Sequence, residues 1–420
     1  MRWLLLFVLA TAVGAQSPLT VDEAVAIALR QNPRIAEARK ALREAEARLK
    51  QARADYYPQI GFSGIAKAGL SGATNGLGLI GLPNSPFYRN FADSVNVYQR
   101  LYDFGRTGHN VEQQRQRQEM LEAEVAAAEA TVTLGTQRAF YGVLRAERLR
   151  EAAERTIRSR ELMVRQAQAF YEGEIRSRVD LELARFSLSQ AQLARIETDH
   201  AAGVAQAQLA GAMGSAPGTE YVLQPPDTAL PPPQPLAVLV EEAHRNRPEL
   251  LALRAERGLA AAAVKLARSQ RRPFLAFVFS GGYGRFTNVL ARQLVAAGTG
   301  LVLPLFIGGR LDGQVEEAEA HLDALDSRLE NERQQATLET RTAYLRFEKA
   351  LEIIPVVQAQ AQYVREAVRL AQARYRERLG SLVELTQAEA GLAEAEARDV
   401  TQFYEAKAAE AELRFAVGRP

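Results

Sequence analysis

The chain has 420 residues, of which 47% are hydrophobic and 24% are charged, so it can bury a large apolar core. Its formal net charge of +2 shows neither a basic excess that would attract nucleic acid nor an acidic tail. Cysteine is absent, which excludes disulfides, thiolate chemistry, cysteine metal ligands and a lipid-modified N-terminal cysteine.

The first feature in chain order is a short apolar run at the N-terminus. Arg2 precedes "WLLLFVLATAV" (residues 3–13), and the small residue Ala15 follows it. This pattern is typical of a secretory signal, which we expect over residues 1–15. A membrane anchor is the alternative, but the run is well short of the ~20 residues that a spanning helix needs. We therefore expect an exported mature chain.

Two helices are expected at the start of the first repeat, which we assign to residues 16–220. Thr20 and Glu23 have the spacing of a capping box at the first helix. Pro33 suits the first turn of the second helix, which we expect to end before Pro58.

Beyond Pro58 the hydrophobic period changes to two. Apolar or small residues share one face and mainly polar or small ones the other, which predicts a strand with one apolar and one wet face. A similar pattern follows Pro273, and we expect partner strands over residues 94–104 and 293–306. The apolar face of the first strand carries Ile60, Phe62, Gly64, Ala66, Ala68 and Leu70.

Very long helices are expected after Gly105 and Gly309, ending near Phe170 and Tyr375, each followed by a turn and a shorter returning helix. Pro355 lies inside the second long helix and predicts a local kink. Apolar residues recur at alternating threes and fours, the seam of coiled-coil packing. In the first long helix this seam contains Leu121, Val125, Ala128 and Val132.

The chain contains the same pattern twice. Gly105 matches Gly309 at an offset of 204, and "VDL" at 179–181 matches "VEL" at 383–385 at the same offset. Upstream, Pro58 matches Pro273 at an offset of 215, so the first copy carries 11 more residues between Pro58 and Gly105. We expect a second repeat over residues 236–420, after a proline-rich linker over 221–235.

Four strands per chain cannot close a barrel, and an open sheet leaves two exposed edges. Inside a bilayer such edges are forbidden, because lipid cannot hydrogen-bond to the backbone. If the strands span a membrane, several chains must pool them, and three chains would give twelve strands, within the range of membrane barrels.

The paired motifs resemble those of TolC-like outer-membrane efflux proteins, the outer membrane factors. The resemblance covers nearly the whole mature chain and is carried by "LTVDEAVAIALRQNP", "LYDFG", "LPLFIGG", "YEGEIRSRVDLELA" and "YRERLGSLVELTQAE". It implies a mainly α protein with β structure, built from a duplicated αα-β-β-αα repeat. It also implies a homotrimer with a twelve-stranded transmembrane barrel in the outer membrane, continued by a long α-helical periplasmic barrel. The missing cysteine departs from the lipidated branch of the family.

The resemblance further implies an exit duct of a tripartite efflux or type I secretion system. Its partners would be a periplasmic adaptor, an inner-membrane transporter and outer-membrane lipid, with no nucleic acid. The exported substrate, the pump and adaptor and the gating residues stay open. A soluble periplasmic coiled-coil scaffold without a pore is the alternative function.

Candidate functional residues follow from the same resemblance. The hairpin turns would form the periplasmic entrance, where a ring of carboxylates would favour cations. Candidates for this constriction are Glu384, Asp180 and Gln387; the alternative is that the two acids only favour the first turn of a helix.

The hairpin tips would also contact the adaptor. The alternative is ordinary turn chemistry, in which glycine supplies a positive φ and arginine solubility. The candidate tip contacts are Gly173, Arg176, Arg178, Leu379, Gly380, Ser381 and Leu382. The joints between barrel and tunnel would be Gly105, Gly309, Pro58 and Pro273.

Two patterns imitate other sites. "GLGLIG" at 76–81 matches a nucleotide-binding glycine loop, but "LPNSP" follows where that loop needs a helix, so we expect an external loop. The four histidines lack ligand spacing, and nothing resembles a nucleophile with its base. We therefore expect no enzyme, metal or cofactor site.

Overall fold

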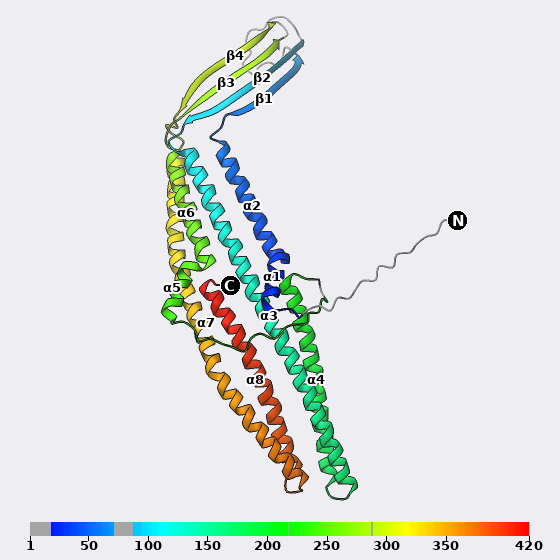
Figure 1. Ribbon diagram of the computed structural model, residues 1–420. Helices are drawn as coiled ribbons and strands as arrows, with labels where there is room; N and C mark the ends of the chain where they lie inside the picture. The colour runs from blue at the N-terminus through cyan, green and yellow to red at the C-terminus, as the bar shows by residue number, and fades with distance from the viewer. Residues whose placement is uncertain (1–17, 71–86, 217, 287–288, 420) are drawn as a thin grey trace, which may run out of the picture. The chain divides into compact units, whose positions relative to one another are not determined.

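The computed structural model describes residues 18–70, 87–216, 218–286 and 289–419 (Figure 1). The expected signal peptide and the "GLGLIG" motif lie outside these residues. The chain forms two compact units. The first comprises Met1–Ala38, Val125–Pro248 and Arg333–Pro420, and the second comprises Arg39–Glu124 and Glu249–Glu332.

Among the described residues, the helices occur as two series of four. In each half their lengths are 11, 22, 67 and 36 residues, in the same order. The first series is α1 (Val21–Gln31), α2 (Pro33–Ala54), α3 (Arg106–Glu172) and α4 (Arg178–Met213). The second is α5 (Leu236–Asn246), α6 (Pro248–Ser269), α7 (Arg310–Arg376) and α8 (Leu382–Val417).

Local signals set several helix ends. The capping box predicted at α1 is confirmed: the Thr20 N–H donates to the Glu23 carboxylate at 2.8 Å, and the Glu23 N–H donates to Thr20 Oγ1 at 3.3 Å. Gly214 and Gly418 end α4 and α8 in the left-handed conformation, with φ of 72° and 82°. Glycine adopts this conformation without the steric cost of a Cβ.

The two long helices follow the prediction closely, because α3 and α7 end within two residues of Phe170 and Tyr375. Helix α7 continues through Pro355 without interruption. In the part of the chain that the structure describes, no helix has the length and apolar character needed to cross a membrane.

The second unit contains one antiparallel sheet in the order β1-β2-β3-β4 (Figure 1). Its strands are β1 (Gln59–Leu70), β2 (Phe87–Tyr102), β3 (Phe274–Phe286) and β4 (Val289–Val302). Strands β2 and β4 begin and end earlier than predicted. Their predicted ends were wrong because Asp103 and Phe104 already form a turn, and because Pro304 lacks the N–H that would extend the ladder.

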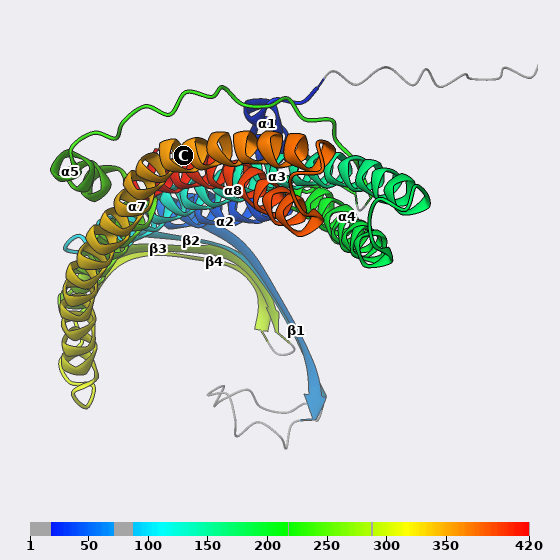
Figure 2. The same ribbon diagram turned by 90° about the horizontal axis from the view of Figure 1, so that it is seen from below.

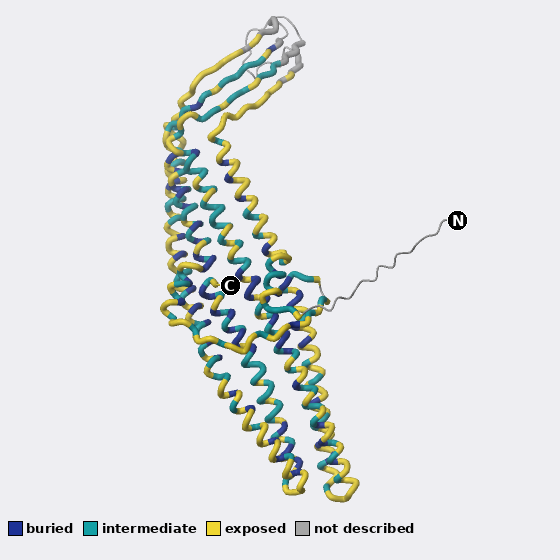
Figure 3. The backbone as a smooth tube through the Cα atoms, viewed as in Figure 1, coloured by how far each residue is buried: buried dark blue, intermediate teal, exposed yellow. Residues whose placement is uncertain are grey.

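The predicted division of the sheet into two faces is confirmed. Phe62 pairs with Val95 on one face, where Phe62 and Val295 are more than 70% exposed. On the other face Ser63 Oγ lies 2.9 Å from Ser94 Oγ, and Asn96 accepts a hydrogen bond from Ser280 at 2.8 Å. Figure 2 shows that the four strands curve together, and Figure 3 shows how little of the sheet is buried.

Glycines lie where strands β2 and β4 give way to long helices. Gly105 has φ of 85° and Gly309 has φ of 77°, and α3 and α7 each begin one residue later. Pro58 and Pro273 each stand one residue before a strand, at the start of β1 and β3. All four of these residues therefore lie at connections between a helix and a strand.

Candidate functional site

The two helical hairpins of the first unit end in equivalent turns. The Ile175 N–H donates to the Phe170 carbonyl at 2.8 Å, and the Leu379 N–H donates to the Arg374 carbonyl at 2.8 Å. The residues with positive φ are Glu174 (58°) and Arg378 (63°), not the tip glycines. The interpretation that Gly173 and Gly380 supply positive φ is therefore wrong. Instead, a Cβ at Gly380 would lie 3.1 Å from the Arg374 Cβ, so close packing favours glycine there.

Arg176 joins the two tips to each other. Its Nη2 donates to the Gly380 carbonyl at 2.7 Å, and its guanidinium lies 5.6 Å from the centre of the Tyr375 ring. Tyr375 is fully buried, packs edge-on against Phe170 at 5.7 Å, and has a raised pKa because of its burial. The surrounding apolar cluster contains Met163, Ala167, Leu181, Ala184, Ala371, Leu382 and Leu385. The tips of one chain thus pack as a single structure.

The constriction candidates lie at the starts of α4 and α8, with Asp180 and Glu384 in the first turns and Gln387 in the second turn of α8. The Glu384 N–H donates to Ser381 Oγ, the N-cap of α8, at 3.1 Å, and its carboxylate lies 3.1 Å from Arg374 Nε. Asp180 lies in the first turn of α4. Gln387 lines a groove of about 470 Å³ beside residues of α4 and α8. The first-turn position of Glu384 and Asp180 fits the helix-dipole alternative as well as a constriction.

The predicted adaptor contacts differ in accessibility. The Leu379 side chain is 72% exposed, and the Arg178 side chain is 76% exposed beside Glu182. Leu382 is only 1% exposed, because it packs in the apolar cluster around Tyr375. Leu382 is therefore corrected from a surface contact to a core residue of the tips.

A buried ion pair joins the two hairpins above the tips, and no sequence motif indicated it. Arg160 Nη1 of α3 donates to Glu389 Oε2 of α8 at 2.6 Å. Glu389 Oε1 also accepts hydrogen bonds from Ser159 at 3.1 Å and from Gln372 of α7 at 3.2 Å. The two charged side chains are only 5% and 8% exposed. Partners 229 residues apart cannot be matched by local spacing, so only the packed hairpins reveal the pair.

This fold, with an open antiparallel sheet whose strands give way to long helical hairpins, is shared with solved structures of outer-membrane channels. The chain is similar to VceC of Vibrio cholerae, with a TM-score of 0.81, 20% identity, and coverage of 95% of this chain and 96% of that one. It is similar to CmeC of Campylobacter jejuni, with a TM-score of 0.83, 16% identity, and coverage of 95% and 85%. The MtrE channel of Neisseria gonorrhoeae gives a TM-score of 0.79, 18% identity, and coverage of 95% and 88%.

Sequence comparison identifies the family. The family model of the outer membrane efflux proteins matches residues 24–215 and 239–419, and the chain therefore belongs to this family. Protein CyaE of Bordetella pertussis is 27% identical over 341 residues, which cover 78% of this chain and 68% of that protein.

Proposed function

We propose that this protein is the outer-membrane exit duct of a tripartite efflux or type I secretion system. Three copies would pool their strands into one twelve-stranded barrel, and their helices would continue it through the periplasm. A periplasmic adaptor would meet the hairpin tips and connect the duct to an inner-membrane pump. The observation that carries this proposal is the open, one-sidedly apolar sheet.

The sheet has two free edges. Strands β1 and β4 are the outermost members of the sheet, and neither pairs with a further strand among the described residues. Free edges in lipid would leave backbone N–H and C=O groups without partners, at several kcal/mol each. Pairing β1 of one copy with β4 of the next would satisfy both edges at once.

The exposed apolar face supports lipid as the environment of the sheet. Ile60, Phe62 and Leu301 are 72%, 74% and 69% exposed in the single chain, whereas the opposite face carries the hydroxyls of Ser63 and Ser94. A strand with an apolar outer face and a polar inner face is typical of membrane barrels. An assembled barrel would bury the apolar face in lipid and line its lumen with the polar face.

Cysteine cross-linking tests the pairing of strands between copies, because the chain has no cysteine of its own. The variant Phe62→Cys is combined in turn with cysteine at positions 295, 297, 299 and 301, which share its face. We expect oxidation to give covalent trimers in at least one register. Replacing Ser63 instead of Phe62 is the matched control, because its side chain points to the other face.

Conductance in planar bilayers tests the pore itself. We expect the detergent-purified protein to conduct ions, and Glu384→Ala to lower the cation selectivity of the pore. Glu366→Ala is the control, since Glu366 is an exposed carboxylate of α7 that pairs with Arg369. A protein that is released without detergent, stays monomeric and conducts nothing would favour the soluble scaffold. If Glu384→Ala conducts ions with unchanged cation selectivity, only the proposed role of Glu384 in the constriction is contradicted.

A further inference from the structure

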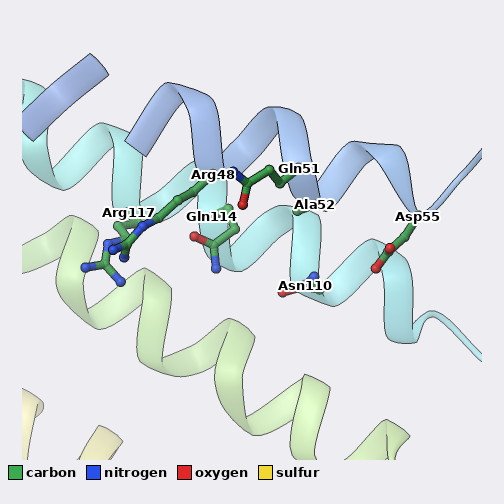
Figure 4. A pocket seen from close by; sticks show the side chains of 7 residues that line it. All are labelled: Arg48, Gln51, Ala52, Asp55, Asn110, Gln114 and Arg117. Atoms are coloured by element: carbon green, nitrogen blue, oxygen red, sulfur yellow. The ribbon is translucent and has the colours of Figure 1, made fainter. Parts of the chain in front are cut away.

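A polar groove lies between α2 and α3 in the second unit (Figure 4). This groove is open to solvent and has a volume of about 380 Å³, at the lower end of the range of small-molecule sites. We propose that this groove binds a small oxyanion, a carboxylate or phosphate group, through Arg48 and Arg117. The groove is lined by Arg48, Gln51 and Ala52 of α2, by Asp55 just beyond the end of α2, and by Asn110, Gln114 and Arg117 of α3.

The groove interrupts the coiled-coil seam of α3. Farther along the helix, the seam holds Leu121 and Val125 at a spacing of four. Continued toward the strands at the same alternation of threes and fours, it reaches Gln118, Gln114 and Val111, of which only Val111 is apolar. Arg117 and Asn110 each lie one residue before a seam position. Polar side chains at seam positions lose the apolar packing that such a seam provides. A bound polar ligand would give Gln114, the seam position that lines the groove, a hydrogen-bond partner.

Two guanidinium groups converge at one end of the groove. The side chains of Arg48 and Arg117 point toward each other from the two helices (Figure 4). Arg48 pairs with Glu44 of its own helix at 2.5 Å. No hydrogen bond or ion pair joins Arg117 to another residue in the described ranges. An anion between the two groups would attract both guanidinium groups, most strongly that of Arg117, because Glu44 already balances part of the Arg48 charge.

The remaining lining residues fit an oxyanion better than a cation. The amides of Gln51, Gln114 and Asn110 lie along the groove, and each can donate an N–H (Figure 4). The groove's one carboxylate, Asp55, lies at the far end from the arginines (Figure 4). It follows Arg48 by seven residues and lies just beyond the end of α2, so it does not neutralise the arginine end. Ala52 is small and leaves the centre of the groove open.

Binding of inorganic phosphate to the full chain in detergent tests the groove, measured by equilibrium dialysis. We expect saturable binding that weakens with salt. Arg117→Gln should weaken it roughly tenfold to hundredfold, as expected for loss of a hydrogen bond to a charged group. Arg117→Lys should retain part of the affinity, because lysine keeps the charge but not the planar fork. Arg115→Gln is the matched control, since Arg115 lies two residues away, pairs with Glu119 at 3.3 Å and does not line the groove.

Competition identifies the source of the anion. Displacement of phosphate by phosphatidylglycerol micelles, but not by citrate, would assign the groove to a lipid headgroup. Displacement by citrate alone would assign it to a soluble anion. Equal affinities in the wild type and Arg117→Gln, with unchanged circular dichroism, would overturn the proposal. Absence of saturable binding up to about 10 mM phosphate would also overturn it. Phosphate binding to the groove does not require the pore to conduct ions. A failure of the oxyanion proposal can therefore be told apart from a failure of the proposed channel function.

Discussion

Breaking the buried pair of Arg160 and Glu389 should destabilise the contact between the hairpins. The substitution Arg160→Met leaves the Glu389 carboxylate buried at 8% exposure with only the Ser159 and Gln372 hydrogen bonds. Removing one partner of a buried ion pair typically costs about 3–5 kcal/mol, since the remaining charge keeps its desolvation penalty. We therefore expect the free energy of unfolding to fall by an amount in that range.

The double variant Arg160→Met with Glu389→Leu separates the pair from its surroundings. It removes both charges and fills their space with apolar atoms, so it should recover most of the loss. The exposed pair of Arg369 and Glu366, 67% and 55% exposed at 2.5 Å, is the matched control. Replacing Arg369 by Met should cost no more than about 1 kcal/mol.

Urea unfolding at one fixed protein concentration, followed by far-ultraviolet circular dichroism, measures these differences. A fixed concentration is needed because assembly contributes to the stability of an oligomer. A stability of Arg160→Met within about 1 kcal/mol of the wild type, or a double variant as unstable as the single one, would contradict a stabilising role of the buried pair.

Two further predictions concern a carboxylate and a glycine. Burial of Asp103 would by itself raise its pKa, but the hydroxyl and N–H of Thr107 and the charge of Arg100 bring the pKa below its usual value. Asp103 then stabilises the fold above the unfolded-state pKa of about 3.9, and this contribution is lost as the pH falls through the lower folded-state pKa. The urea midpoint of Asp103→Asn should therefore depend less on pH below about 4 than that of the wild type, and parallel curves would contradict this. Gly214→Ala should cost about 2–3 kcal/mol, because its φ is 72° and the added Cβ would lie 2.9 Å from the Asn32 Cα. Gly203→Ala within α4, where a Cβ meets nothing within 4 Å, should instead stabilise by about 0.5–1 kcal/mol, and equal effects at both glycines would contradict the packing argument.

Elements governed by local signals were predictable from the sequence. The capping box of α1, the ends of the long helices and the alternation along β1 all follow from spacing within a few residues. Strand ends were less predictable, since β2 and β4 stop where Phe104 turns to positive φ and where a proline approaches. The turn at the hairpin tips was also misassigned, because Glu174 and Arg378 adopt a conformation that is usual for glycine.

The sequence by itself determined the class of the elements, their order and the double pattern, because helix and strand periods and turn residues act over short distances. Only the tertiary structure decided which distant side chains meet. Arg176 contacts Gly380 from 204 residues away, and Arg160 reaches Glu389 from 229 residues away. The groove between Arg48 and Arg117 likewise requires two helices to pack side by side. Such contacts depend on how whole helices pack, and a single sequence carries no local signal for that packing.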